Sequence, residues 1–113
     1  MNNVLSALEH VLQERRQSDP ENSYVASLYA KGLNKVLEKV GEEAIEVIIA
    51  AKDAQRVPEK SSEVIAEVAD LWFHTLVMLQ ALHLSHEDVL AELSKRFGLS
   101  GLEEKAKRGL GKT

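Results

Sequence analysis

Apolar residues recur at helical spacing along most of the chain. Side chains three and four positions apart share one face of an α-helix. This spacing predicts a first helix that runs to about Gln17, with Asn2 or Asn3 as its N-cap. Polar residues over 18–22 end it, a short helix over 24–30 follows, and Gly32 separates that helix from a long one over 33–54.

The long helix carries one apolar stripe, which we expect to be core. Pro58 then marks a break, Ser61 or Ser62 is the expected N-cap, and a second long helix should continue to about Leu84. This second helix is apolar in almost every direction, which is typical of a buried helix. Its polar residues fall on one stripe that must face a cleft or a subunit interface. The apolar stripe of 33–54 is Leu33, Val36, Leu37, Val40, Ala44, Val47, Ile48 and Ala51, and the polar stripe is Glu63, Glu67, Asp70 and His74.

Ser85 to Asp88 has the pattern of a capping box, which predicts a further helix that Gly98 stops. A last short helix is expected over 102–108. Hydrophobic residues make up 44% of the 113 residues and charged residues 28%, while Pro, Gly and aromatic residues are scarce. The pattern therefore predicts one all-α domain over 1–113, a bundle of four to five helices.

The charge distribution excludes several classes of protein. The formal net charge is −4 and there is no basic cluster, so nucleic acid is not an expected partner. The chain has no cysteine, which excludes disulfides and a zinc–thiolate site. The N-terminus lacks the features of a signal peptide, and acids interrupt the apolar stretch over 64–84, so no membrane span is expected. We expect a cytoplasmic protein.

The acids of the second long helix need a counter-charge. Glu63, Glu67 and Asp70 share a face, and no Lys or Arg lies on that helix to pair with them. Burying unpaired carboxylates is costly, and a bound cation, or protonation, is the usual remedy. On the first long helix Glu42 and Glu46 lie beside Lys35 and Lys39, so that helix alone fits a solvated face with ion pairs.

Two antiparallel long helices would place Glu43, Glu46, Glu67 and Asp70 opposite one another. Four oxygen donors favour Mg²⁺, with Mn²⁺ as the alternative, over Zn²⁺. Mg²⁺ held by carboxylates keeps positions open for water and phosphates, which indicates phosphoanhydride chemistry. Lys35 and Lys39 are either phosphate ligands or ordinary surface lysines, and His74 either supports the site or is a core histidine.

The pattern Glu-Glu-x-x-Glu, followed about twenty residues later by Glu-x-x-Asp, resembles the signature of the all-α nucleoside triphosphate pyrophosphohydrolases, the MazG-like superfamily. A more specific resemblance is to the phosphoribosyl-ATP pyrophosphohydrolase family, which catalyses the second step of histidine biosynthesis. The residues that carry it are Ser23-Tyr24, Ala30-Lys31-Gly32, the run KVLEKVGEEAIEVIIAAK over 35–52, and SGLEEKA over 100–106.

The resemblance implies Mg²⁺-dependent hydrolysis of phosphoribosyl-ATP to phosphoribosyl-AMP and pyrophosphate by a homodimer. It implies that Glu42 orients or deprotonates the attacking water and that Lys39 lies near the phosphates. Glu63 would support the site or add a ligand. The implied metal ligands are Glu43, Glu46, Glu67 and Asp70. Candidates for reading the adenine and phosphoribosyl groups are Arg15, Arg16, Tyr24, Lys105 and Arg108, by position only.

Three other functions compete with this one. A house-cleaning pyrophosphohydrolase would use the same metal site on ordinary or damaged nucleotides. A di-iron oxidase needs Glu-x-x-His motifs, and neither acidic stretch has a His three residues after a Glu. A non-enzymatic dimerisation module would need no metal, and its acids would serve only solubility.

Overall fold

The computed structural model describes residues 3–98, and in that range it contains five α-helices, one 3₁₀ turn and no strand. The all-α prediction is confirmed. The short helix expected over 102–108 lies outside the described residues, as do Asn2, Lys105 and Arg108. The elements are α1 (Val4–Arg15), α2 (Tyr24–Lys31), α3 (Leu33–Arg56), η1 (Pro58–Lys60), α4 (Ser61–Ala81) and α5 (His86–Arg96).

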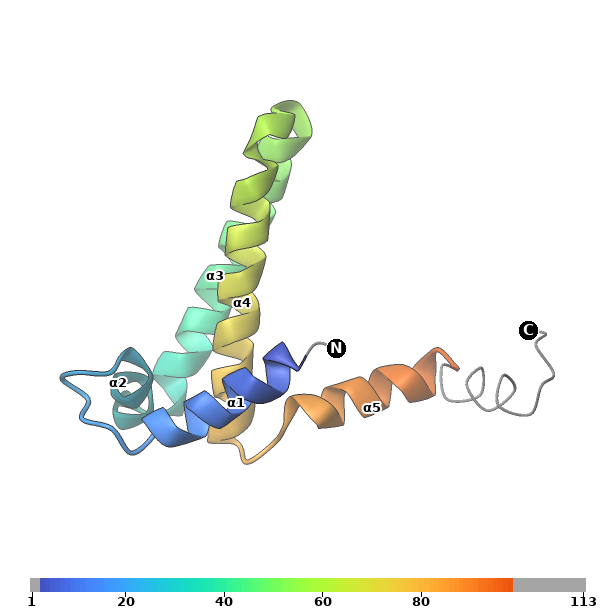
Figure 1. Ribbon diagram of the computed structural model, residues 1–113. Coiled ribbons are helices and arrows are strands. Elements are labelled where there is room, and N and C mark those ends of the chain that lie inside the picture. The colour runs from blue at the N-terminus through green and yellow to red at the C-terminus, as the bar shows by residue number, and fades with distance from the viewer. Residues whose placement is uncertain (1–2, 99–113) are drawn as a thin grey trace.

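Helices α3 and α4 form a long antiparallel hairpin, and η1 closes its tip. Figure 1 shows this hairpin projecting away from α1 and α2, which lie at its open end, while α5 starts there and extends outward. Gly32 joins α2 to α3 with a φ of 97°, a backbone conformation that residues with a Cβ rarely adopt. The hairpin therefore starts at a sharp, glycine-dependent turn directly after α2.

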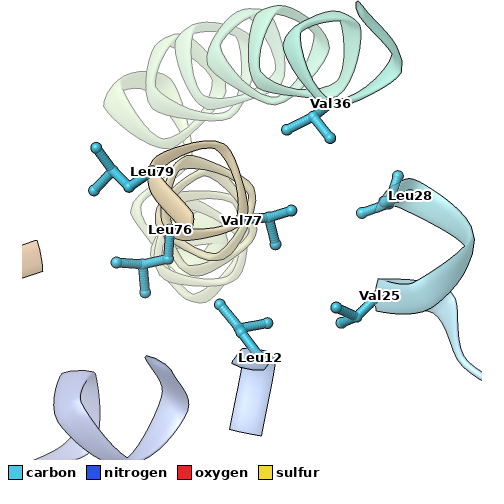
Figure 2. Packing of buried hydrophobic residues seen from close by; sticks show 7 residues of the cluster. All are labelled: Leu12, Val25, Leu28, Val36, Leu76, Val77 and Leu79. Carbon is cyan, nitrogen blue, oxygen red and sulfur yellow. The ribbon is translucent and has the colours of Figure 1, made fainter. Parts of the chain in front are cut away.

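The hydrophobic core lies at the open end of the hairpin. Val77 of α4 is completely buried, and Figure 2 shows it between Leu12 of α1, Leu28 of α2 and Val36 of α3. Side chains from four helices therefore meet around one residue of α4. Burying such side chains is the main stabilising contribution to a fold of this size. The buried cluster is Leu12, Val25, Leu28, Val36, Leu76, Val77 and Leu79.

The expected burial of the two long helices is wrong at positions along the whole hairpin, including Leu33 and Leu37 of the α3 stripe, which are 38% and 43% exposed near the open end. Ile48 of α3, assigned to the core stripe, is 58% exposed, and Ile65 and Trp72 of α4 are 71% and 59% exposed. In their place Glu43 and Ala50 are buried on α3. The physical reason is that, among residues 3–98, α1 and α2 pack at the open end and α5 packs on α1, so near the tip α3 and α4 bury surface mainly against each other and η1.

Side-chain capping follows the prediction at one helix and departs from it at another. The Ser85 side chain caps α5, and the Asp88 carboxylate accepts a hydrogen bond from the Ser85 N–H, which confirms the capping box. Ser61 does not cap α4, because η1 runs directly into that helix and the Ser61 hydroxyl donates to the Pro58 carbonyl. Asn3 occupies the N-cap position of α1 without a side-chain bond.

One stretch of the described chain, Pro58–Ala81, is long and apolar enough to cross a membrane by length and composition alone. The core helix of a soluble protein passes the same test, so the composition is weak evidence for a membrane span. The carboxylates of Glu63, Glu67 and Asp70 lie within it.

Glu9 fixes the start of α5 on α1. Its carboxylate accepts hydrogen bonds from the Ser85 hydroxyl and the His86 N–H, both at 2.9 Å, and the His86 ring lies 3.2 Å away. Burial by itself raises the pKa of Glu9, but the bonds from His86 and Ser85 outweigh it and hold this pKa below the ordinary 4.5. A carboxylate whose pKa is lowered in the folded state stabilises the fold where it is ionised.

We therefore expect Glu9→Gln to destabilise the protein at neutral pH by about 1.5–3 kcal/mol, the usual range for hydrogen bonds to a charged group. The difference from wild type is fully present above the ordinary Glu pKa and disappears as the pH falls through the lowered folded-state value. Urea unfolding at a series of pH values measures it. Glu14→Gln, an exposed change on the same helix, is the control. A destabilisation that does not shrink as the pH falls through the acid range would contradict this role.

Candidate metal centre

Three carboxylates from two helices meet between α3 and α4. One oxygen each from Glu43, Glu46 and Glu67 lies within 4.8 Å of the other two. Glu43 and Glu46 are three residues apart on one face of α3, and Glu67 faces them from α4. The antiparallel hairpin therefore creates the group from two segments about twenty residues apart.

Two oxygens of this group lack hydrogen-bond partners. Oε1 of Glu43 and Oε1 of Glu67 are buried and accept no bond, although the large majority of buried polar atoms in proteins are paired. Burial raises the pKa of Glu67, and the negative charges of Glu46, Asp70 and Glu43 raise it further. The cluster is thus a concentration of negative charge without an internal counter-charge.

These observations fit a bound divalent cation. A cation at the cluster would take up the unpaired oxygens and remove the repulsion between the carboxylates. All the donors are carboxylate oxygens, a hard set typical of Mg²⁺, Mn²⁺ or Ca²⁺ and poor for soft metals. The group can therefore bind a metal, and its donors alone do not identify the ion.

The other acids expected in the site lie around this group. Asp70 is exposed and is not one of the three grouped carboxylates, although its charge acts on Glu67. Glu63 is exposed one turn nearer the tip than Glu67, and it too lies outside the group. Glu42 accepts a hydrogen bond from the Lys39 ammonium at 3.1 Å. The structure thus brings together three of the four expected metal ligands.

Both lysines expected at the phosphates form ion pairs with acids of their own helix, α3. Lys35 pairs with Glu38 at 3.3 Å and Lys39 with Glu42 at 3.1 Å, as a solvated helix face would have them. The hydrogen bond to Glu42 raises the pKa of Lys39, and the nearby Tyr24 and Glu43 raise it further. Lys39 therefore stays a cation one helical turn before Glu43.

His74 is a buried histidine with two partners, and neither is a carboxylate. Its Nε2 lies 2.8 Å from the Tyr24 hydroxyl, and its Nδ1 lies 2.8 Å from the Asp70 carbonyl oxygen. The sequence marked Tyr24 by its place at the start of α2 and by the family resemblance, and it gave no reason to join it to His74, fifty residues later. Spatial proximity, which the pattern of one chain does not show, is the signal that was missing.

Arg16 has partners within the fold. Its guanidinium donates to the Gln80 carbonyl at 3.1 Å and lies over the Tyr29 ring at 4.5 Å. It therefore ties α1 to α2 and α4. Arg15 is exposed at the end of α1.

The fold and the site define an all-α protein whose acidic cluster between two antiparallel helices suits hydrolysis of a phosphoanhydride. The sequence model of one family, phosphoribosyl-ATP pyrophosphohydrolase, matches residues 5–97. The chain belongs to this family and is a hydrolase that acts on a nucleotide. The match covers both long helices and therefore the whole cluster.

Proposed function

We propose that this protein hydrolyses phosphoribosyl-ATP in the cytoplasm, in a reaction that depends on Mg²⁺ bound at Glu43, Glu46 and Glu67. The products are phosphoribosyl-AMP and pyrophosphate. The observation that carries the proposal is the cluster itself, with two buried carboxylate oxygens that have no partner. Family membership supports the substrate.

Asp70 completes the proposed ligand set, since a rotation of its exposed side chain toward Glu67 adds a fourth carboxylate. Glu63 and His74 support the set from the neighbouring turns of α4. Mg²⁺, when bound, supplies positive charge at the phosphate oxygens and lowers the pKa of coordinated water. The carboxylates by themselves would repel a triphosphate.

In this proposal Lys39 binds the phosphates and Glu42 acts on the attacking water. The Lys39 ammonium pairs with Glu42 in the protein alone, and a triphosphate is a stronger partner for it. Binding of the phosphates at Lys39, with Lys35 one turn away, releases the Glu42 carboxylate. Glu42 then orients the attacking water and accepts its proton.

The first test is the substrate. Purified protein with Mg²⁺ should release pyrophosphate from phosphoribosyl-ATP, and Glu46→Gln should lower kcat by about 100-fold or more because one of the carboxylates that hold the Mg²⁺ is lost. Glu59→Gln, at the exposed tip of the hairpin, is the matched control and should keep full activity. Comparable turnover of common deoxynucleoside triphosphates would instead identify a house-cleaning enzyme.

The second test is the metal, read by thermal unfolding without substrate. In EDTA, Glu67→Gln should melt at or above the wild-type temperature because it relieves repulsion. At a Mg²⁺ concentration 100 times Kd, the wild type gains about 2.7 kcal/mol and the variant gains less, so their order reverses. Equal Mg²⁺ shifts in wild type, Glu67→Gln and Glu59→Gln would contradict the site and favour a non-enzymatic module.

We also propose that the protein works as a homodimer joined along the hairpin. Ile45, Ile48 and Ile49 share a face of α3 and are each more than half exposed, and Ile65 and Trp72 are exposed on α4. Trp72 also lines an apolar groove of 410 Å³ between α1, α4 and α5. Large exposed apolar surfaces are typical of interfaces between subunits.

The dimer is tested by sedimentation at micromolar concentration. Wild type should sediment as a dimer, and the double change Ile45→Lys with Ile49→Lys should give monomers because two charges would be buried in the interface. Val4→Lys, an equally exposed apolar position outside the hairpin, is the control and should leave the dimer intact. A wild-type monomer, or a double variant that stays dimeric, would contradict this interface.

A further inference from the structure

Tyr24 stands at the open end of the hairpin with half of its side chain in solvent. It is 51% exposed, whereas the His74 beside it is 6% exposed. Its ring stacks on Phe73 with centroids 6.3 Å apart and meets the edge of the His74 ring at 5.8 Å. An exposed tyrosine with its ring packed on two aromatic neighbours has a fixed orientation, so its hydroxyl occupies a defined place.

A chain of two hydrogen bonds decides which way the hydroxyl proton points. The Asp70 carbonyl oxygen can only accept, so Nδ1 of His74 must carry the hydrogen in their 2.8 Å contact. A neutral imidazole that donates from Nδ1 has only a lone pair at Nε2. The Tyr24 hydroxyl, 2.8 Å from Nε2, therefore donates its single proton to His74.

The hydroxyl oxygen of Tyr24 is then left as a pure acceptor toward solvent. With its proton committed to His74, it offers only lone pairs to a bound molecule. A phosphate oxygen, which is also an acceptor, would be repelled. A neutral O–H group of the substrate would be bound. The His74 partner thus changes a residue that can ordinarily donate or accept into one that selects for donors.

The position of Tyr24 indicates which donor of the nucleotide reaches it. The two hydrogen bonds join the Tyr24 hydroxyl through His74 to the backbone of Asp70, the exposed acid of the proposed metal site on α4. On the facing helix α3, Lys39, the main proposed phosphate contact, lies one turn before Glu43. In a nucleoside triphosphate the group next to the phosphates is the ribose, and its hydroxyls are neutral donors.

We propose that Tyr24 is a specificity-determining residue that accepts a hydrogen bond from a hydroxyl of the ribose that carries the triphosphate. His74 is the positioning residue that holds Tyr24 as an acceptor, through the Asp70 backbone. The proposal rests on the proposed function, since it places the phosphates at Lys39 and the acidic cluster.

The test compares phosphoribosyl-ATP with its 2′-deoxy and 3′-deoxy derivatives, altered in the ribose that carries the triphosphate. In wild type, removing the hydroxyl that meets Tyr24 should lower kcat/KM about three- to tenfold, the value of one hydrogen bond. In Tyr24→Phe this penalty should disappear, and kcat/KM for phosphoribosyl-ATP itself should fall by a similar factor.

Tyr29→Phe is the matched control. It removes a hydroxyl from the same helix, and the Tyr29 hydroxyl is buried without a hydrogen-bond partner. Its penalties for both derivatives should equal those of wild type. A purely structural role of Tyr24 would lower the activity on all three substrates equally.

Two results distinguish a failure of the proposed Tyr24 role from a failure of the proposed function. Penalties for both derivatives that are the same in wild type and Tyr24→Phe would overturn the role of Tyr24 while leaving the proposed function intact. No pyrophosphate release from phosphoribosyl-ATP by the wild type would defeat the proposed function, and with it this proposal.

Discussion

The packing of α3 against α4 is the contact on which the rest of the structure depends. It is the most extensive contact between helices in the described chain, and it brings Glu43 and Glu46 to Glu67. The hydrophobic cluster around Val77 holds the two helices together at their open end, where α1 and α2 also pack. The acids sit farther toward the tip, between α3 and α4. The hydrophobic packing at the open end of the hairpin thus holds the carboxylates in place farther along it.

This arrangement combines a stabilising core with a destabilising site. Three carboxylates whose nearest oxygens lie within 4.8 Å of one another repel, and two of their oxygens have lost water without gaining a partner. Such a site is costly in a domain of this size, whose net stability is small. A cation converts the same charges into ligands. The cost of the cluster is therefore consistent with a binding role rather than a structural one.

The side chains along the hairpin form an ordered series. The acidic cluster comes first, Lys39 with Glu42 lies one turn toward the open end, and Tyr24 with His74 follows. The proposed contacts to metal, phosphates and sugar follow the same order as these groups in a nucleotide. Helix α2 contributes the last member, and Gly32 directs the chain from that helix into α3. This turn thus sets where α2, and with it Tyr24, lies against the hairpin.

The sequence by itself determined the helices, because each carries its own periodicity and end signals, as at Ser85 and Asp88. It also indicated that Glu67, on a helix without Lys or Arg, needed a counter-charge. Only the tertiary structure decided that Ser61 follows η1 without capping, that Ile48 and Ile65 stay exposed, and that Asp70 stands outside the three grouped acids. It alone joined Tyr24 to His74. Local patterns fix what a segment forms, whereas burial and pairing depend on which distant segments meet, and one chain's periodicity does not contain that information.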